Sequence, residues 1–115
     1  MSFYPMPAIL VGNVTNDPEV KHTANGDTFA VFDVAVNMRK KDSSGQWVPN
    51  GALFERCVAW RFAAEAVANN IKKGDPVIVL GQYRDNSYDS EGKDPQGNPI
   101  TKRVRARQVV VDYIG

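Results

Sequence analysis

The sequence has little of what catalytic and metal-binding sites are usually built from. It contains one cysteine, Cys57, and one histidine, His22, in 115 residues. A disulfide within the chain is therefore excluded, and so is a cysteine-rich metal site. A glycine-rich phosphate-binding motif is missing, and no further carboxylate or histidine lies beside Asp17 and Glu19 to complete a metal site. We predict a protein that is not an enzyme and that carries no metal or cofactor.

Long apolar runs and a strong net charge are also absent. No stretch approaches the roughly 20 consecutive apolar residues that span a membrane, and the N-terminus lacks the basic segment and apolar core of a signal peptide. We therefore expect no contact with membranes, a cytoplasmic location, and one globular domain over residues 1–115. The net charge of +1 gives no general attraction to nucleic acid, so the positions of the cations must decide any such binding.

Turn signals and alternating apolar residues predict a mainly β protein. Ala30, Phe32, Val34 and Val36 share one face of a strand, and Asn25-Gly26-Asp27 predicts the turn of a hairpin before it. Apolar residues recur at helical spacing from Phe62 to Ile71. The predicted strands are residues 8–14, 20–23 with 28–37, 53–60, 76–83 and 100–114, of which residues 77–80 are expected to be buried on both faces.

Two polar segments, residues 38–51 and 84–99, are predicted to be long loops. Five or so strands, with one helix between the third and fourth and two long polar loops, match the five-stranded Greek-key barrel called the OB-fold. We therefore predict this architecture for the whole chain.

A candidate binding face lies on the strand that ends at Trp60. Phe54, Arg56 and Trp60 alternate, so they share one side of a sheet. Aromatic surfaces interleaved with cations suit unpaired nucleotides, because bases stack on rings and phosphates attract charge. The alternative is that Phe54, Val58 and Trp60 face the core while Arg56 reaches out past them. The alternation alone does not choose between these two interpretations.

Other candidate contacts lie elsewhere in the chain. Arg103, Arg105 and Arg107 alternate and would form a row of cations about 7 Å apart on one strand, or would serve only to keep an exposed strand from pairing with other chains. Tyr88 and Trp47 could each fold from a loop over a nucleic acid, or pack on the protein's own surface.

Several motifs, taken in order, resemble the bacterial single-stranded DNA-binding protein family over nearly the whole chain. Each motif is common alone, but their order and spacing together are specific. They are Ile9-Leu10-Val11-Gly12-Asn13, Asp17-Pro18-Glu19-Val20, Asn25-Gly26, Ala59-Trp60 followed by Ala64-Glu65, and Lys73-Gly74-Asp75-Pro76-Val77-Ile78-Val79-Leu80-Gly81.

The resemblance implies an OB-fold that binds single-stranded DNA without sequence preference in replication, recombination and repair, usually as a homotetramer, near the nucleoid. It places stacking positions on Phe54, Trp60 and Tyr88 and a basic position on Arg56, so it favours the DNA-binding face. We expect the remaining phosphate contacts from Arg84 and the arginine row. The alternative function is an OB-fold module that binds proteins, such as a primosome-type accessory protein.

The chain departs from the family pattern in three ways. Lys40 stands where the family often has an aromatic residue, so this contact is ionic here or Trp47 replaces it. Glu55 stands where many members have a histidine at the subunit interface, which bears on the tetramer. The chain ends at Gly115, whereas typical family members continue to an acidic tail that recruits repair and replication proteins. Either this sequence is the core of a longer protein, or the protein does not recruit those partners.

Overall fold

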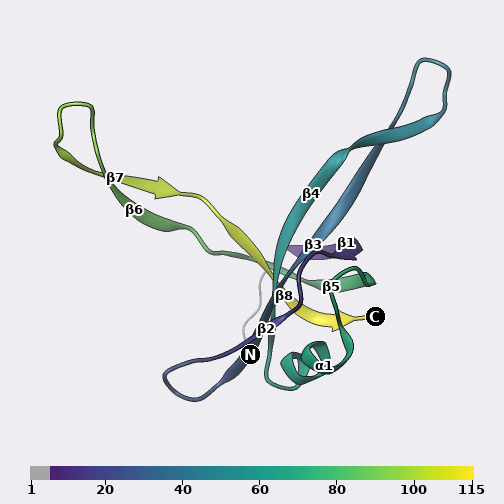
Figure 1. The fold of residues 1–115 in the computed structure, drawn as a ribbon, viewed down its shortest axis with the longest axis horizontal. Helices are drawn as coiled ribbons and strands as arrows, with labels where there is room; N and C mark the ends of the chain where they lie inside the picture. The colour runs from purple at the N-terminus through teal and green to yellow at the C-terminus, as the bar shows by residue number, and fades with distance from the viewer. Residues whose placement is uncertain (1–5) are drawn as a thin grey trace.

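The computed structural model describes residues 6–115, which form a β-barrel with two long hairpin arms (Figure 1). Eight strand segments and one helix are found in this part of the chain. In chain order they are β1 (Pro7–Val14), β2 (Glu19–His22), β3 (Thr28–Lys41), β4 (Trp47–Trp60), α1 (Phe62–Asn70), β5 (Pro76–Asp85), β6 (Tyr88–Lys93), β7 (Pro99–Val104) and β8 (Arg107–Ile114).

Five of these strands close into the predicted barrel. They pair in the order β1-β5-β8-β4-β3, and β1 returns to β3 through the pairs Asn13↔Ala35 and Val14↔Val34. Only glycine fits beside this closure, because a Cβ at Gly12 would overlap the backbone carbonyl of Ala35. The helix lies between the third and fourth barrel strands, β4 and β5, so the prediction of an OB-fold is confirmed.

Alternating side chains from each barrel strand fill the interior. Ala30, Phe32 and Val34 of β3 are fully buried, and Val36 packs against them, as the sequence pattern predicted. Burial of apolar surface is the main favourable term in folding. The core also contains Ala8, Leu10, Val14, Cys57, Ala59, Ala64, Val67, Val77, Val79, Val109 and Val111.

Two details of the predicted core are wrong. Residues 77–80 are buried on one face only, since Ile78 and Leu80 are exposed while Val77 and Val79 are buried. The helix forms where predicted, but its buried residues are Ala64 and Val67, and Phe62 is 88% exposed. Phe62 lies on the outer side of the helix with the exposed Glu65 and Ala66. The opposite side, which carries Ala64 and Val67, faces the core.

The two predicted loops are instead β-hairpin arms. β3 and β4 remain paired out to Lys41↔Trp47, and β6 pairs with β7 from Tyr88↔Val104 to Lys93↔Pro99. Figure 1 shows the arms diverging from the same side of the barrel. Polar composition was misleading here, because a two-stranded arm has both faces in water and needs no buried residues.

Both arms end in the same kind of turn. Asp42 Oδ1 accepts hydrogen bonds from the backbone N–H groups of Ser44 and Gln46, and Asp94 Oδ1 accepts them from Gln96 and Asn98. The hydrogen bond from the Ser44 side chain, followed by that from the Gln46 backbone, lowers the pKa of Asp42. The glycine three residues after each aspartate has a positive φ, 86° at Gly45 and 85° at Gly97. This Asp-x-x-Gly pattern is the sequence signal for the arms.

Candidate nucleic-acid interface

The two faces of β4 have different environments. Glu55, Cys57 and Ala59 point inward and are 7%, 0% and 0% exposed, whereas Phe54 is 69% exposed. Trp60 is half-buried on the outward side. The alternative in which Phe54 and Trp60 fill the core is therefore wrong, although Val58 on the same outward side is buried between neighbouring strands.

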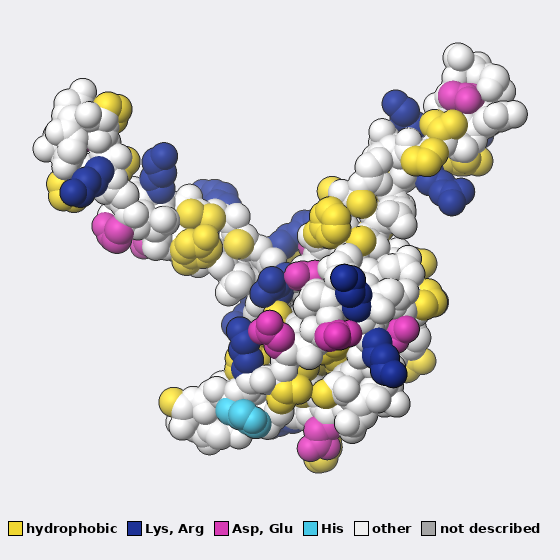
Figure 2. Space-filling model, in the orientation of Figure 1, with side chains coloured by type: hydrophobic (Ala, Val, Ile, Leu, Met, Phe, Trp, Pro, Cys, Tyr) yellow, Lys and Arg dark blue, Asp and Glu magenta, His cyan; other side chains and the backbone are white. Residues whose placement is uncertain are grey.

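An open groove of about 690 Å³ runs along this outward face. Its walls come from β3, β4, the end of β5, the start of β6 and the start of β8, so it lies on the barrel at the base of the second arm. Figure 2 shows basic side chains gathered where the arms leave the barrel. The aromatic residues that line the groove are Phe29, Trp60 and Tyr88, and the cationic ones are Arg56, Arg84 and Arg107.

Phe29 was missed by the sequence analysis. It pairs with Trp60 in the β3–β4 register, and the two ring centroids are 4.8 Å apart at an angle of 34°. Such a tilted arrangement is favourable between aromatic rings. The signal was present, because Phe29, Val31 and Asp33 alternate with the buried residues of β3 and must face outward.

Most of the arginines predicted to contact phosphates form ion pairs within the chain. Arg56 Nε lies 2.8 Å from Asp33 Oδ1, across the β3–β4 pair. Arg107 Nη2 lies 2.7 Å from Glu55 Oε1, and this hydrogen bond raises the pKa of Arg107. In each ion pair the guanidinium still lines the groove, but the neighbouring carboxylate offsets its positive charge.

The predicted row of three arginines on one strand is not present. Arg103 lies on β7, Arg107 begins β8, and Arg105 lies in the break between these strands. Arg103 also pairs with Asp89 of β6 at 3.4 Å. The strand breaks here because the Ser87 hydroxyl takes the place of a strand partner and accepts a hydrogen bond from the Ala106 N–H.

Three further candidate residues lie on the first arm or at its base, outside the walls of the groove. Trp47 begins β4 in the arm, is 62% exposed, and has the ammonium of Lys41 5.3 Å from its ring centroid. Lys40 is exposed on the same arm and pairs with Val48. Phe54 lies where this arm joins the barrel. Tyr88, 55% exposed, links the groove to the second arm.

A profile of the single-strand binding protein family matches residues 6–113, almost the whole of the chain. The chain belongs to this family. The single-stranded DNA-binding protein of Mycolicibacterium smegmatis is 44% identical over 82 residues, which are 70% of this chain and 50% of that protein. Single-stranded DNA-binding protein 3 of Listeria innocua is 38% identical over 92% of this chain and 59% of its own length. The chain thus spans about half the length of the curated relatives it matches.

The fold of this family member is also found in a solved structure. A small single-stranded DNA-binding protein from Streptomyces coelicolor superposes with a TM-score of 0.70 at 25% identity, over 96% of this chain and 92% of that one. Both the sequence motifs and the barrel therefore place the chain in the single-strand binding protein family.

Other kinds of site find little support in residues 6–115. No group of three or more His, Cys, Asp or Glu side chains is placed to hold a metal ion there. Burial, followed by the charges of Glu55 and Asp33, raises the pKa of Cys57 to about 12. The helical part of the described chain offers no span long and apolar enough to cross a bilayer.

Proposed function

We propose that this protein binds single-stranded DNA without sequence preference and protects it during replication, recombination and repair in the bacterial nucleoid. The observation that carries the proposal is one open groove lined by three aromatic rings and three arginines. Membership of the single-strand binding protein family supports the same function, as do relatives that are named for it. The function requires no catalytic residue, metal or cofactor.

Stacking on the groove rings provides the sequence-independent part of the affinity. Trp60 and Phe29 form one platform, and Tyr88 stands at the entrance to the second arm. Each stacked base contributes about 1 to 3 kcal/mol, and every base has a flat face that a ring can cover. A duplex already stacks and pairs its bases, so the groove favours single strands.

The arginines hold the phosphates beside these rings. Arg84 and Arg56 lie in the groove walls, while Arg105 lies at the base of the arm. Cations that neutralise phosphates release counterions, so the affinity for single strands falls with salt at a log–log slope of about −0.7 per phosphate. Because Arg56 is paired with Asp33, we assign it chiefly to positioning, and Arg84 and Arg105 to charge.

The arms extend the contact surface beyond the groove. Phe54 and Trp47 are among the most exposed large apolar side chains on the described chain, and both lie along the β3–β4 arm. With Lys40 they form a second set of ring and cation contacts for a longer strand. In this proposal, Lys40 provides an ionic contact. Trp47 provides the aromatic contact that the family often has at the position of Lys40.

We further propose that the protein acts as a homo-oligomer, expected to be a tetramer. Ile9 and Val11 of β1 lie opposite Leu80 and Ile78 of β5, and Tyr113 of β8 lies opposite Leu80. All five point outward and are 38% to 74% exposed. A continuous apolar patch of this kind marks an interaction surface, and its position away from the DNA groove allows both to be used at once.

A second copy of the chain fits this patch better than another partner. Within residues 6–115, β1 pairs with β3 only at Asn13 and Val14, which leaves the edge from Pro7 to Val11 available for pairing. An open edge and an apolar face on the same strand can both be satisfied by the same strand of a partner related by two-fold symmetry. Sedimentation of the wild type and of Ile9→Asp tests this, because the substitution should produce a smaller particle.

Tryptophan fluorescence tests the DNA-binding proposal directly. In a Trp47→Phe variant only Trp60 reports, and an oligothymidine should quench its emission while a duplex of equal length should not. The matched control is Trp60→Phe, in which Trp47 is the remaining tryptophan and its emission reports binding at the first arm. Emission that changes only when a protein partner is added would favour the alternative, an OB-fold interaction module, and would contradict the proposal.

A further inference from the structure

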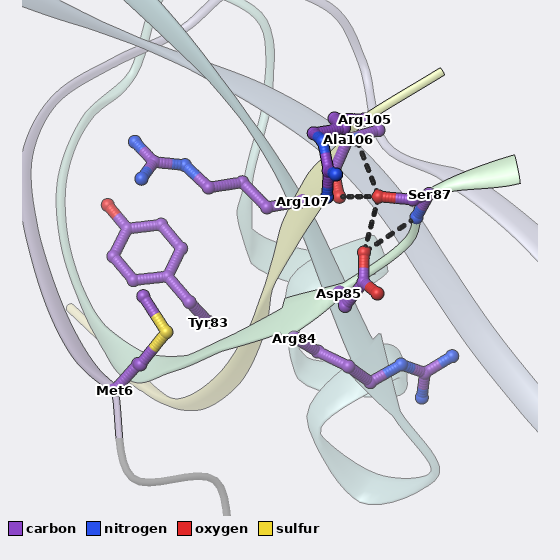
Figure 3. A pocket seen from close by; sticks show the side chains of 8 residues that line it. All are labelled: Met6, Tyr83, Arg84, Asp85, Ser87, Arg105, Ala106 and Arg107. Atoms are coloured by element: carbon purple, nitrogen blue, oxygen red, sulfur yellow. Dashed lines mark hydrogen bonds between the residues drawn. The ribbon is translucent and has the colours of Figure 1, made fainter. Parts of the chain in front are cut away.

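A second groove adjoins the DNA-binding groove on β5 and β8. It has a volume of about 470 Å³, and Figure 3 shows the side chains that line it. Arg84, Ala106 and Arg107 line both grooves. A polymer that leaves the first groove past Arg107 therefore enters the second without crossing another element of the barrel.

Three side chains in this region are joined through Arg107, which contacts both Tyr83 and Glu55. The guanidinium carbon of Arg107 lies 4.3 Å from the ring centroid of Tyr83, and Figure 3 shows the guanidinium extending over the ring. Glu55 holds the same guanidinium at 2.7 Å, and the Glu55 side chain is only 9% exposed whereas that of Arg107 is 52% exposed. The Arg107 guanidinium is thus held through one N–H group by a buried carboxylate and lies over a ring, while half of the side chain stays open to solvent.

This arrangement suits a base better than a phosphate. The charge of Arg107 is offset by Glu55, which weakens its pull on an anion, but its flat face remains available, and guanidinium planes are stacking surfaces for unpaired bases. Asp85 adds a negative charge to the same groove and is held there by the N–H and hydroxyl of Ser87. An uncharged ring meets no repulsion from Asp85, whereas a phosphate would.

We infer that Tyr83 and Arg107 form a second nucleotide subsite, where a base of the strand leaving the first groove stacks on the Arg107–Tyr83 unit. This inference rests on the proposed function, because it assigns the next position of the same strand. Arg107 becomes a stacking residue instead of a phosphate contact. Glu55 is its positioning residue, and Arg105 at the rim of the groove is the nearby cation for the phosphate.

Binding of oligothymidines of two lengths tests the subsite, with lengths of about 4 and about 16 nucleotides chosen from the range that OB-folds cover. Tyr83→Leu keeps an apolar side chain but removes the ring, and Arg107→Lys keeps the charge opposite Glu55 but removes the plane. Both should weaken binding of the long oligomer by about tenfold, within the range for one lost stack. Tyr83→Leu should leave the short oligomer unaffected, because Tyr83 lines the second groove and not the first.

Matched variants control for charge and for folding. Tyr83→Phe keeps the ring and should bind both oligomers as the wild type does. Arg61→Lys makes the same exchange as Arg107→Lys but outside both grooves, where Arg61 pairs with Asp27, and should bind both oligomers as the wild type does. Thermal unfolding and sedimentation of each free variant should match the wild type.

Three results would overturn the subsite. Arg107→Lys with wild-type affinity for the long oligomer would show that the charge matters and the plane does not. Equal weakening of both lengths, accompanied by lower thermal stability, would give the pair a purely structural role. A smaller sedimenting species for Tyr83→Leu would show that the groove contacts another subunit. Failure of the proposed function is distinct from all three, because the wild type itself would then bind neither oligomer.

Discussion

The barrel and the two arms of this protein are stabilised in different ways. In the barrel, each strand places alternate side chains into a shared interior, where Phe32, Val34 and Val79 are fully buried. In the arms, both faces of a two-stranded ribbon are in water, and most side chains from Lys40 to Leu53 are exposed. The arms depend on backbone hydrogen bonds and on the turns at Asp42 and Asp94, not on a core.

The difference separates stability from binding. Residues of the barrel interior contribute apolar burial and cannot touch a ligand, while exposed rings such as Trp47 and Tyr88 contribute little burial and are free to stack. The groove lies between these two regions, where a rigid sheet presents Trp60 and Phe29 next to a less constrained arm. Placing rings on a rigid sheet reduces the entropy that is lost when a base binds.

Phe32→Ala should produce the largest loss of stability, about 3 to 5 kcal/mol in the free energy of unfolding, because it leaves a cavity in the core. Trp47→Ala on the arm should cost no more than about 0.5 kcal/mol, as expected for a surface position. Urea unfolding at one fixed protein concentration measures both values. Similar losses of stability for the two variants would show that the arm unfolds together with the core. The barrel and the arm would then not differ in how they are stabilised.

The Cys57 thiol should be about a thousandfold less ionised than an unfolded cysteine, since its pKa rises from 9.0 to about 12. The folded state therefore holds the thiol proton more tightly than the unfolded state does. The contribution of Cys57 to the free energy of unfolding is fully present below pH 9 and is lost as the pH rises towards 12. Ser43→Cys on the first arm gives an exposed thiol for comparison. At pH 8 a thiol reagent should label position 43 quickly and Cys57 only after denaturation, and rapid labelling of native Cys57 would contradict this.

The same contrast explains which parts of the fold could be predicted from the sequence. Alternation from Ala30 to Val36 and the Asn25-Gly26 turn placed the barrel strand and its hairpin correctly, because one face is buried. The arms have no buried face, so their polar sequences resembled loops. The Asp-x-x-Gly turn at each tip is the feature of these sequences that is typical of a hairpin.

The candidate site was predictable where it depended on one strand and unpredictable where it depended on two. The alternation of Phe54, Arg56 and Trp60 correctly placed them on one face of β4. The ion pairs Arg56–Asp33 and Arg107–Glu55 join residues that are 23 and 52 positions apart. Such pairs follow from the register between strands, which local pattern does not give.

Gly81→Ala in the barrel and Gly92→Ala in the second arm should have opposite effects. A Cβ at Gly81 would overlap the backbone carbonyl of Val110, and backbone cannot move aside cheaply, so we expect a loss of about 1 to 3 kcal/mol or more. A Cβ at Gly92 meets nothing within 4 Å, and the smaller freedom of the unfolded chain should stabilise this variant by up to about 1 kcal/mol. Thermal unfolding compares them, and a destabilised Gly92→Ala would indicate that the arm packs against something.

Trp60→Ala and Arg105→Ala should separate the rings on the barrel from the charge at the base of the arm. Trp60→Ala removes a stacking surface, so the affinity for an oligothymidine falls while the salt dependence stays the same. Arg105 is in no ion pair within 4.0 Å in residues 6–115, so its loss should make the log–log salt slope shallower by about 0.7, the value for one phosphate on a single strand. Titrations at four or more salt concentrations give both slopes. If neither Arg105→Ala nor the corresponding alanine variants of Arg103 and Arg107 change the slope, these arginines take no part in binding phosphates and the charge must come from elsewhere in the groove.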